Sequence, residues 1–325
     1  MAQQLLSQGY SVHGTTRDLG QMNTRNLVAL QIADQVTIRG LDLTERQSTL
    51  DLIDELRPDE IYHLAAPSSV ARSFKEPAST IESITQTTVN LLDSVRIIDD
   101  SIRCFVASST EIFGQCDAPV TVHSAHNPAS PYGVGKSCAH YQARNYREAY
   151  GLYVCSGVLS NFESVLRTPN YVTSKIIIGA CKIALGETNS ISLGNLSVRR
   201  DWGNAADFMQ AANLCLLQDQ PRDYLIATGK THSLLQFLES VCALLGLDYR
   251  NHLEVEESLF RPRDIPQTLC DPSATNEQLN WQPQTSFNQL AFTMLKSELI
   301  KQAGEKRAHE LLDTNHTNII ALDQT

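Results

Sequence analysis

The chain has 325 residues, 42% of them hydrophobic and 19% charged, so it is long enough to bury the core of one large domain or two. Its formal net charge of −10 at pH 7 argues against a nucleic-acid partner, although a local basic pocket for a small anionic ligand is compatible with it. No apolar run reaches the ~18 residues of a membrane span, and the eight cysteines, which form no Cys-x-x-Cys pair, are typical of reduced thiols in a cytoplasmic protein.

Strand and helix patterns alternate through the first half of the chain. Helices are predicted over 2–9, 44–56, 80–98 and from Pro131 onward, and strands over 10–15, 36–39, 60–66, 103–109 and 152–159. The spacing Thr44-Glu45-Arg46-Gln47 is that of a capping box. Strands that alternate with helices indicate right-handed βαβ connections and a doubly wound, parallel, Rossmann-like sheet in an α/β fold.

The start of the chain departs from that pattern. A dinucleotide-binding fold begins with a central strand and a Gly-rich turn whose amides hold the cofactor pyrophosphate, and neither precedes the helix predicted over 2–9. In the strand order 3-2-1-4-5-6, loss of strand 1 leaves a gap in the middle of the sheet. We therefore expect a divided sheet, and we hypothesise that the gene product starts roughly a dozen residues earlier. The first residues are too polar for a secretion signal.

After about Phe162 the pattern becomes mixed. Helices are predicted over 172–185, 205–217 and 233–245, with a short strand at 223–227. We predict a first domain over 1–162, a smaller mixed α/β domain over 163–304 that is partly interleaved with the first, and a polar tail over 305–325 that is either a frayed helix or loose.

Four side chains in two neighbouring stretches form an acid/base constellation. If Pro131 opens a helix, Tyr132 and Lys136 lie on one helical face, and an ammonium beside a phenol favours the phenolate. Upstream, a buried strand ends at Ser109, and Glu111 follows it. A Tyr and a Lys four residues apart are by themselves more often an ordinary solvated pair. The presence of Ser, Glu, Tyr and Lys in this order along a strand, a loop and a helix favours a catalytic role over a solvated pair.

Two histidines, His123 and His126, raise the question of a metal. They lie in a Pro-rich loop without Cys or carboxylate partners, so we expect no metal site.

The constellation resembles the extended short-chain dehydrogenase/reductase superfamily, and further stretches narrow the resemblance to the GDP-mannose 4,6-dehydratases. Those stretches are Gly9–Gly14 with Arg17, Asp42-Leu43, Leu64–Ser68, Asn161–Ser164, Arg167, Asn170–Lys175, Ser192–Leu196, Arg200–Gly203 and Arg261–Asp264. The similarity runs from residue 1 to about 300. It implies an NADP-dependent hydro-lyase of the cytoplasm that acts on GDP-mannose and supplies deoxyhexose, as in GDP-fucose biosynthesis.

The resemblance also implies roles for individual residues. The catalytic residues are Ser109, Glu111, Tyr132 and Lys136. The NADP-binding residues are Arg17, Asp42, Leu43, Leu64, Ala65, Ala66, Ser68, Tyr132, Lys136 and Arg167. The substrate-binding residues are Asn161, Lys175, Arg200, Arg261 and Asp264. Arg200 and Arg261 could instead be salt-bridge partners of Asp201 and Asp264.

The implied reaction is an internal redox cycle. Tyr132, helped by Lys136, removes the proton of the sugar 4-hydroxyl while hydride leaves C4 for NADP, and Ser109 hydrogen-bonds the developing ketone. Glu111 then takes the C5 proton and protonates the departing 6-hydroxyl, and hydride returns to C6. Glu111 separates dehydratases from epimerases, which need no base for C5.

The chain departs from the family pattern at several positions. Ser109 replaces a Thr, Phe162 a His and Pro67 a Gln; Asp264 replaces a Glu. Leu166-Arg167-Thr168 replaces Arg-Arg-Gly, and Asn204 and Ala206 replace a His and a Lys. These changes bear on affinity and substrate choice more than on reaction class.

Two other functions stay open at this point. One is a nucleotide-sugar 4-epimerase or 4-ketoreductase with the same Ser, Tyr and Lys set, and the other is an inactive homologue that acts as a binding partner. The resemblance further implies a homo-oligomer, either a dimer or a tetramer, with no membrane partner.

Overall fold

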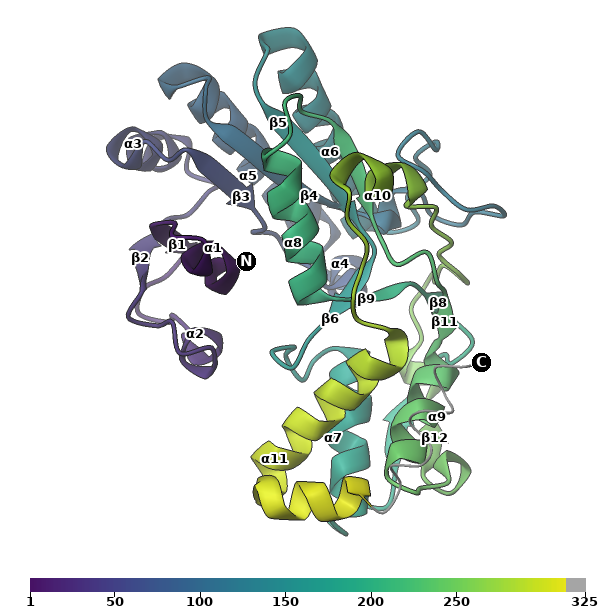
Figure 1. Cartoon of the computed structure of the whole chain (residues 1–325). Coiled ribbons are helices and arrows are strands. Elements are labelled where there is room, and N and C mark those ends of the chain that lie inside the picture. The colour runs from purple at the N-terminus through teal and green to yellow at the C-terminus, as the bar shows by residue number, and fades with distance from the viewer. Residues whose placement is uncertain (314–325) are drawn as a thin grey trace.

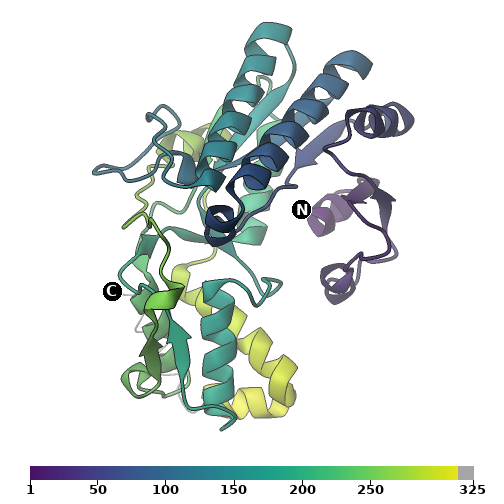
Figure 2. The same cartoon turned by 180° about the vertical axis from the view of Figure 1, so that it is seen from behind.

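The computed structural model describes residues 1–313, and its centre is a four-stranded parallel sheet with helices on both faces (Figures 1 and 2). In the order β10-β5-β4-β3, the strands are β3 (Glu60–His63), β4 (Arg103–Ser109), β5 (Val154–Leu159) and β10 (Asp223–Ile226). Phe105 pairs with Tyr62 on one side and Cys155 on the other, so the carboxyl ends of the strands share one edge. The predicted α/β fold with a parallel sheet is confirmed.

The two faces of this sheet are covered by different helices. On one face lie α3 (Arg46–Leu56), α5 (Pro77–Ile98) and α6 (Pro131–Tyr150), and on the other α8 (Ala205–Leu216) and α10 (Ser273–Leu279). Leu92 and Val95 of α5 pack with Val106 and Val154 of the sheet, and all four side chains are fully buried. Removing such side chains from water is the main stabilising contribution to a core of this kind.

Helix α6 begins where the sequence predicts. Pro131 is its first residue, and the Ser130 hydroxyl accepts a hydrogen bond from the Gly133 amide at 3.1 Å. A Cβ at Gly133 would come within 2.7 Å of the Glu111 carbonyl oxygen. Glycine therefore allows the start of α6 to lie directly against the short 3₁₀ turn η1 (Thr110–Ile112) that follows β4.

The predicted division of the sheet is confirmed. Strands β1 (Val12–Thr16) and β2 (Val36–Gly40) form a parallel pair of their own, and among residues 1–313 no strand joins β1 to β3. This pair, with α1 (Ala2–Ser7) and α2 (Arg25–Ala29), stands to one side of the larger sheet in both views (Figures 1 and 2). The Tyr10 hydroxyl donates to Glu60 Oε1 at 3.1 Å, which links the two sheets.

The second half of the chain adds a smaller helical layer and short strand pairs. Three helices share a core with Trp202: α7 (Val172–Ala184), α9 (Leu234–Leu244) and α11 (Phe287–Asp313). The strand pairs are β6 (Asn161–Glu163) with β9 (Trp202–Asn204), β7 (Ile191–Leu193) with β12 (Leu253–Val255), and β8 (Arg199–Arg200) with β11 (His232–Ser233). The remaining short elements are α4 (Val70–Lys75), η2 (Tyr249–Asn251) and η3 (Glu257–Leu259).

Residues 305–313 of the predicted tail are helical, as one of its two alternatives expected, but they are packed rather than frayed. Helix α11 turns at Gly304, where φ is 78°, and then continues, and Ala308 and Leu312 are buried in the same core as Trp202. The polar composition of the segment hides these two apolar contacts, which are four residues apart on one helical face. The part of the tail prediction that concerns 314–325 lies outside the described residues. Within 1–313, no helix combines the length and the apolar character needed to cross a bilayer.

Candidate functional site

Tyr132 and Lys136 lie in the first turns of α6, and both side chains are buried. The Lys136 ammonium is 5.9 Å from the centroid of the Tyr132 ring, and its Nζ donates to the Ala107 carbonyl at 2.7 Å. Burial lowers the pKa of Lys136 to about 8. The carbonyl bond fixes the lysine beneath the end of β4 and uses one of its three ammonium protons.

Ser109 and Glu111 reach the same place from the end of β4. The Ser109 hydroxyl accepts from the Glu111 amide at 3.3 Å and starts the turn η1. Burial raises the pKa of Tyr132; a hydrogen bond from Ser109 opposes that shift, and the Glu111 charge adds to it. The structure therefore brings together the four side chains of the predicted acid/base constellation.

Glu111 also faces two arginines. Burial raises the pKa of its carboxyl group, while the charges of Arg200 and Arg261 oppose that shift. A carboxyl group whose pKa lies above its ordinary value is suited both to accept and to release a proton.

The two arginines are held by Asp264, which was predicted as a substrate contact. Arg200 Nη2 lies 3.0 Å and Arg261 Nη1 lies 3.3 Å from Asp264 Oδ1. Arg200 also donates to the Ile265 carbonyl, whereas Asp201 accepts from Ser160 and from the 228–229 turn instead. The alternative pairing of Arg261 with Asp264 is therefore confirmed, whereas that of Arg200 with Asp201 is wrong, because Arg200 also pairs with Asp264.

Lys175 lies on α7 beside a cavity of 690 Å³. The cavity runs along α7 and is lined by Pro169, Lys175, Ile178, Gly179, Lys182, Glu187, Thr188, Ser190, Ile191, Ser192 and Glu256. Asn161 is half-buried at the start of β6. Of these two predicted substrate contacts, Lys175 lies on a helix of the smaller helical layer, and Asn161 lies in the strand that directly follows β5.

The predicted cofactor residues near the N-terminus lie at the end of β1 and just after β2. Arg17 is 70% exposed and its Nε is 3.7 Å from Asp42 Oδ2. Asp42 Oδ1 accepts from the Thr44 amide and hydroxyl, which lowers the pKa of Asp42. The Leu43 carbonyl accepts from the Asn90 side chain at 2.9 Å. An arginine that is this exposed and this loosely paired is free to contact a phosphate.

The segment Leu64–Ser68 forms the turn after β3. The strand was predicted to extend to Ala66, but β3 ends at His63, and Leu64–Ala66 lie outside the sheet. Leu64 is 41% exposed and Ala65 is exposed as well, so the turn presents backbone and small side chains to solvent. The Ser68 and Tyr171 hydroxyl oxygens are 2.6 Å apart, so this turn touches the segment that leads into α7.

Arg167 contacts two other side chains, those of Glu163 and Tyr171. Its Nε is 2.8 Å from Glu163 Oε2, and its guanidinium carbon lies 3.6 Å from the centroid of the Tyr171 ring. Burial raises the pKa of Glu163 to about 7, and the Arg167 charge opposes that shift. Sequence reasoning gave neither Glu163 nor Tyr171 a role of its own. The equal spacing of Glu163, Arg167 and Tyr171 was the only signal, and outside a helix it predicts no contact.

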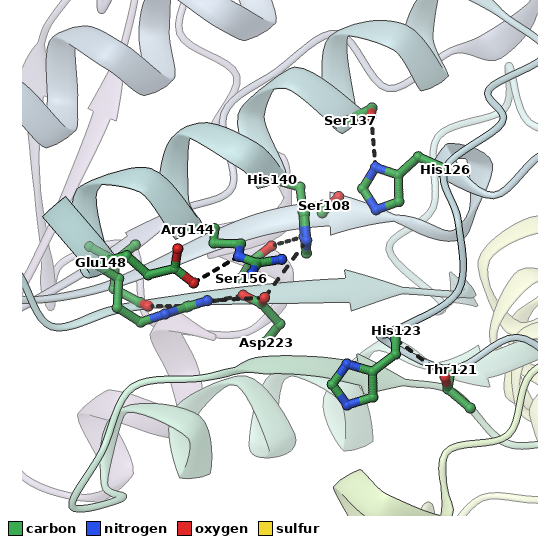
Figure 3. A network of polar contacts seen from close by, with 12 residues as sticks. Ser108, Thr121, His123, His126, Ser137, His140, Arg144, Glu148, Ser156 and Asp223 are labelled. Atoms are coloured by element: carbon green, nitrogen blue, oxygen red, sulfur yellow. Dashed lines mark hydrogen bonds and ion pairs between the residues drawn. The ribbon is translucent and has the colours of Figure 1, made fainter.

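The two histidines considered as metal ligands have other surroundings. His126 Nδ1 lies 2.7 Å from the Ser137 hydroxyl, and His123 is an exposed loop residue (Figure 3). Burial lowers the pKa of His126 to about 4. Across residues 1–313, no group of three or more His, Cys, Asp and Glu side chains is arranged to hold a metal.

A polar network attaches α6 to the sheet (Figure 3). His140 Nδ1 is 2.9 Å from the Ser156 hydroxyl, and its Nε2 is 3.7 Å from Asp223. Arg147 forms a two-point contact with Asp223 at 2.9 and 3.0 Å. These bonds tie α6 to β5 and β10 and so keep Tyr132 and Lys136 in place.

The chain is similar to known proteins in sequence and in fold. A sequence model of the family described as GDP-mannose 4,6 dehydratase matches residues 1–294. GDP-mannose 4,6 dehydratase 1 of Arabidopsis thaliana is 36% identical over 312 residues, which cover 93% of this chain and 86% of the relative. Among solved structures, a dTDP-glucose 4,6-dehydratase of Streptomyces venezuelae, with NAD bound, is 20% identical at a TM-score of 0.80, over 93% of this chain and 92% of that one. A UDP-glucose 4-epimerase of Thermotoga maritima, with UDP-glucose, is likewise 20% identical at a TM-score of 0.80, over 93% and 94% of the two chains.

Proposed function

The chain belongs to the GDP-mannose 4,6-dehydratase family, and from this premise we propose that it converts GDP-mannose to GDP-4-keto-6-deoxymannose with loss of water. The observation that carries the proposal is the position of Glu111, a half-buried carboxyl group beside Tyr132 and Ser109. Abstraction of a proton from C5 requires a base at such a position, and epimerisation at C4 does not.

The residues of this chain fit the adenosine end and the nicotinamide ribose of a nicotinamide dinucleotide, and we propose NADP. The exposed Arg17 guanidinium suits a 2′-phosphate. Lys136 has two ammonium protons beyond the one given to Ala107, which suits the hydroxyls of a ribose. Asp42, Leu43 and the turn at Leu64–Ser68 would hold the adenosine end and the middle of the dinucleotide. When bound, NADP accepts a hydride from C4 of the sugar and returns it to C6.

The chain's own residues move the protons. Tyr132 takes the proton of the 4-hydroxyl, and the Ser109 hydroxyl donates to the oxygen as it becomes a ketone. The ketone makes the C5 proton acidic, and Glu111 removes it. Glu111 then gives that proton to the 6-hydroxyl, which leaves as water. C5 takes up a proton when hydride has reached C6, and release of the proton that Tyr132 took balances this uptake.

The diphosphate needs fixed positive charge, and we propose that Arg200, Arg261 and Lys175 supply it. Asp264 orients both guanidinium groups, which leaves donors on each for the ligand. The cavity along α7 has room for the nucleoside, and we propose that Asn161, at the start of β6, contacts the sugar.

We also infer a cytoplasmic dimer or tetramer that serves deoxyhexose synthesis. Support comes from apolar side chains that α5 and α6 leave exposed, among them Ile97, Val134 and Tyr150. Light scattering of the purified protein tests the oligomeric state.

Incubation with GDP-mannose and NADP, followed by mass spectrometry, tests the reaction. The proposal predicts a product lighter by one water, with no net consumption of cofactor. A C4 epimer of unchanged mass would instead identify an epimerase, and net oxidation of NADPH would identify a ketoreductase. Failure to bind NADP(H) would favour an inactive binding partner.

A further inference from the structure

Asp201 is a buried carboxyl group to which the reaction steps given above assign no task. It lies between β8 and β9, directly after Arg200. Its Oδ1 accepts from the Ser160 hydroxyl at 2.9 Å and from the Thr228 hydroxyl at 2.9 Å. The backbone amides of Thr228 and Gly229 donate to the same carboxyl group, at 3.0 and 2.7 Å.

The hydrogen bonds of Asp201 are those of an ionised carboxylate. Burial raises the pKa of this group, and the bonds from Thr228, Ser160 and Gly229 oppose that shift. A backbone amide can only donate, and amides reach both oxygens of the side chain, so both oxygens act as acceptors. An asparagine has a single acceptor oxygen, so it would leave buried donors at this position without a partner.

Asp201 joins two segments that lie on either side of it. Ser160 directly precedes Asn161, which pairs with Trp202 where β6 meets β9. The turn at 228–229 leads into β11, where His232 pairs with Arg200. The carboxylate therefore ties the backbone beside Arg200 to both neighbouring strand pairs.

The guanidinium group of Arg200 is held by other residues. Arg200 is 5% exposed, its Nη1 donates to the Ile265 carbonyl at 2.8 Å, and its Nη2 donates to Asp264 Oδ1 at 3.0 Å. Asp264 thus orients the end of the side chain, whereas Asp201 fixes the backbone from which the side chain starts. A charged group that must meet a diphosphate needs both, because a small displacement removes a hydrogen bond.

We propose that Asp201 is a positioning residue for Arg200: by binding Ser160 and the turn at 228–229, its carboxylate fixes the backbone from which the Arg200 guanidinium reaches the diphosphate of the substrate. This inference rests on the proposed role of Arg200 in binding that diphosphate. Loss of the carboxylate should weaken nucleotide binding while the reacting groups on β4, η1 and α6 keep their arrangement.

The experiment measures the affinity for GDP by calorimetry in the wild type, Asp201→Asn, Arg200→Gln and the double variant. Asp201→Asn should bind GDP about ten- to a hundredfold more weakly, as expected when a hydrogen bond to a charged group is lost. The double variant should bind no more weakly than Arg200→Gln alone, because Asp201 then has no guanidinium to position. In turnover, KM for GDP-mannose should rise in Asp201→Asn with little change in kcat.

The matched control is Asp207→Asn. Asp207 also accepts from two backbone amides, those of Gln284 and Thr285 at 3.0 and 2.8 Å, but it lies on α8 and binds neither Ser160 nor the turn at 228–229. This variant should bind GDP as the wild type does. Ser160→Ala removes only one bond to Asp201 and is the milder variant if Asp201→Asn does not fold; it should weaken GDP binding in the same way, to a smaller extent.

Wild-type affinity for GDP in both Asp201→Asn and Ser160→Ala, or losses that add in the double variant, would overturn the inference. A second measurement does not depend on nucleotide binding. In protein with nitrogen-15 in arginine, the Arg200 side-chain resonances, assigned by their absence in Arg200→Gln, should exchange with solvent faster in Asp201→Asn than in the wild type or in Asp207→Asn. Equal exchange contradicts the inference even if the wild type binds no GDP. A wild type that does not bind GDP, but whose Arg200 exchange responds to Asp201→Asn, contradicts only the proposed function.

Discussion

At the scale of single residues, the site depends on Glu111 and Tyr132 having different environments although they are neighbours. Burial raises the pKa of both groups, but Glu111 faces the positive charges of Arg200 and Arg261, whereas Tyr132 faces Ser109 and Arg167. Two acids with different partners can act at different steps of one reaction. Glu111 can therefore handle the C5 proton and Tyr132 the 4-hydroxyl proton.

Replacement of Glu111 separates the two halves of the reaction. Glu111→Gln keeps the shape of the side chain but removes the base, so water loss should fall by about 10²- to 10⁴-fold while oxidation at C4 continues. Mass spectrometry of the sugar nucleotide, together with the absorbance of reduced nicotinamide, measures both steps. Full dehydration by this variant would refute the role of Glu111. Asp117→Asn, which changes an exposed carboxylate in the following loop, is the control and should react normally.

Stability should fall on the acid side because of His63. This imidazole is buried, and its pKa is lowered to about 3, first by burial and second by the Lys136 charge. In the unfolded chain the same group titrates near its ordinary value of ~6.5. Between these values the unfolded state binds the extra proton, so the free energy of unfolding decreases as pH falls, by about 1.4 kcal/mol per pH unit for this group.

Urea unfolding at several pH values between 4 and 6 measures this dependence. His63→Asn should have a shallower slope than the wild type, whatever its absolute stability. The control is His123→Asn at an exposed loop position. Equal slopes for His63→Asn and the wild type would show that His63 is not the group responsible.

The four catalytic candidates could be found from the sequence because their chemistry depends on local spacing and on strand ends. Arg167 shows the limit of that reasoning. Similarity to a family suggested a cofactor contact, but its partners, Glu163 and Tyr171, depend on how an irregular loop folds over the site. Asp264 shows the same limit, because its pairing with Arg200 joins segments 64 residues apart.

At the scale of elements, the junction of β4, η1 and α6 sets the geometry. Ser109 ends the strand, Glu111 lies in the turn, and Tyr132 lies in the first turn of the helix. Gly133 permits the close contact between turn and helix. The distance between Glu111 and Tyr132 is therefore controlled by a position that has no side chain.

Gly133→Ala tests this junction. In an ordinary helix, alanine would stabilise by about 1 kcal/mol relative to glycine. Here the new Cβ would meet the Glu111 carbonyl oxygen at 2.7 Å, so the turn must shift, and overpacking of this kind costs about 1–3 kcal/mol. We expect a lower melting temperature and a loss of dehydration. Asn145→Ala, at an exposed position further along α6, should retain both, and a stabilised, fully active Gly133→Ala would contradict this view of the junction.

Helices were predicted well where caps and apolar periodicity agree. α6 starts at Pro131 as predicted, and α7 starts at Val172 and ends within one residue of its predicted end. The capping box at Thr44 does not form, because the Thr44 amide and hydroxyl bond to Asp42 and the helix starts at Arg46. Short polar residues compete for the same backbone groups, so spacing alone does not decide which one caps.

At the scale of the whole molecule, residues 1–313 form a four-stranded parallel sheet and several separate strand pairs, and the proposed catalytic groups lie at the carboxyl edge of the four-stranded sheet. The smaller pair, β1 and β2, carries Arg17 and is followed by Asp42, and Tyr10 links it to Glu60 of the larger sheet. The separation of β1 and β2 from the larger sheet could be predicted from the sequence, because it follows from the strand order of this fold. The packing of residues 305–313 could not be predicted from composition. It depends on the contact of Ala308 and Leu312 with a core formed by residues far away in the sequence.

The central claim is that one hydrogen moves within the sugar from C4 to C6 while water leaves. The most direct measurement uses GDP-mannose that carries deuterium at C4, with NADP present, and locates the label by NMR. The account predicts a 4-keto-6-deoxy product in which the deuterium has moved to C6. Deuterium that remains at C4 of an intact hexose, or that is lost to solvent, would contradict it.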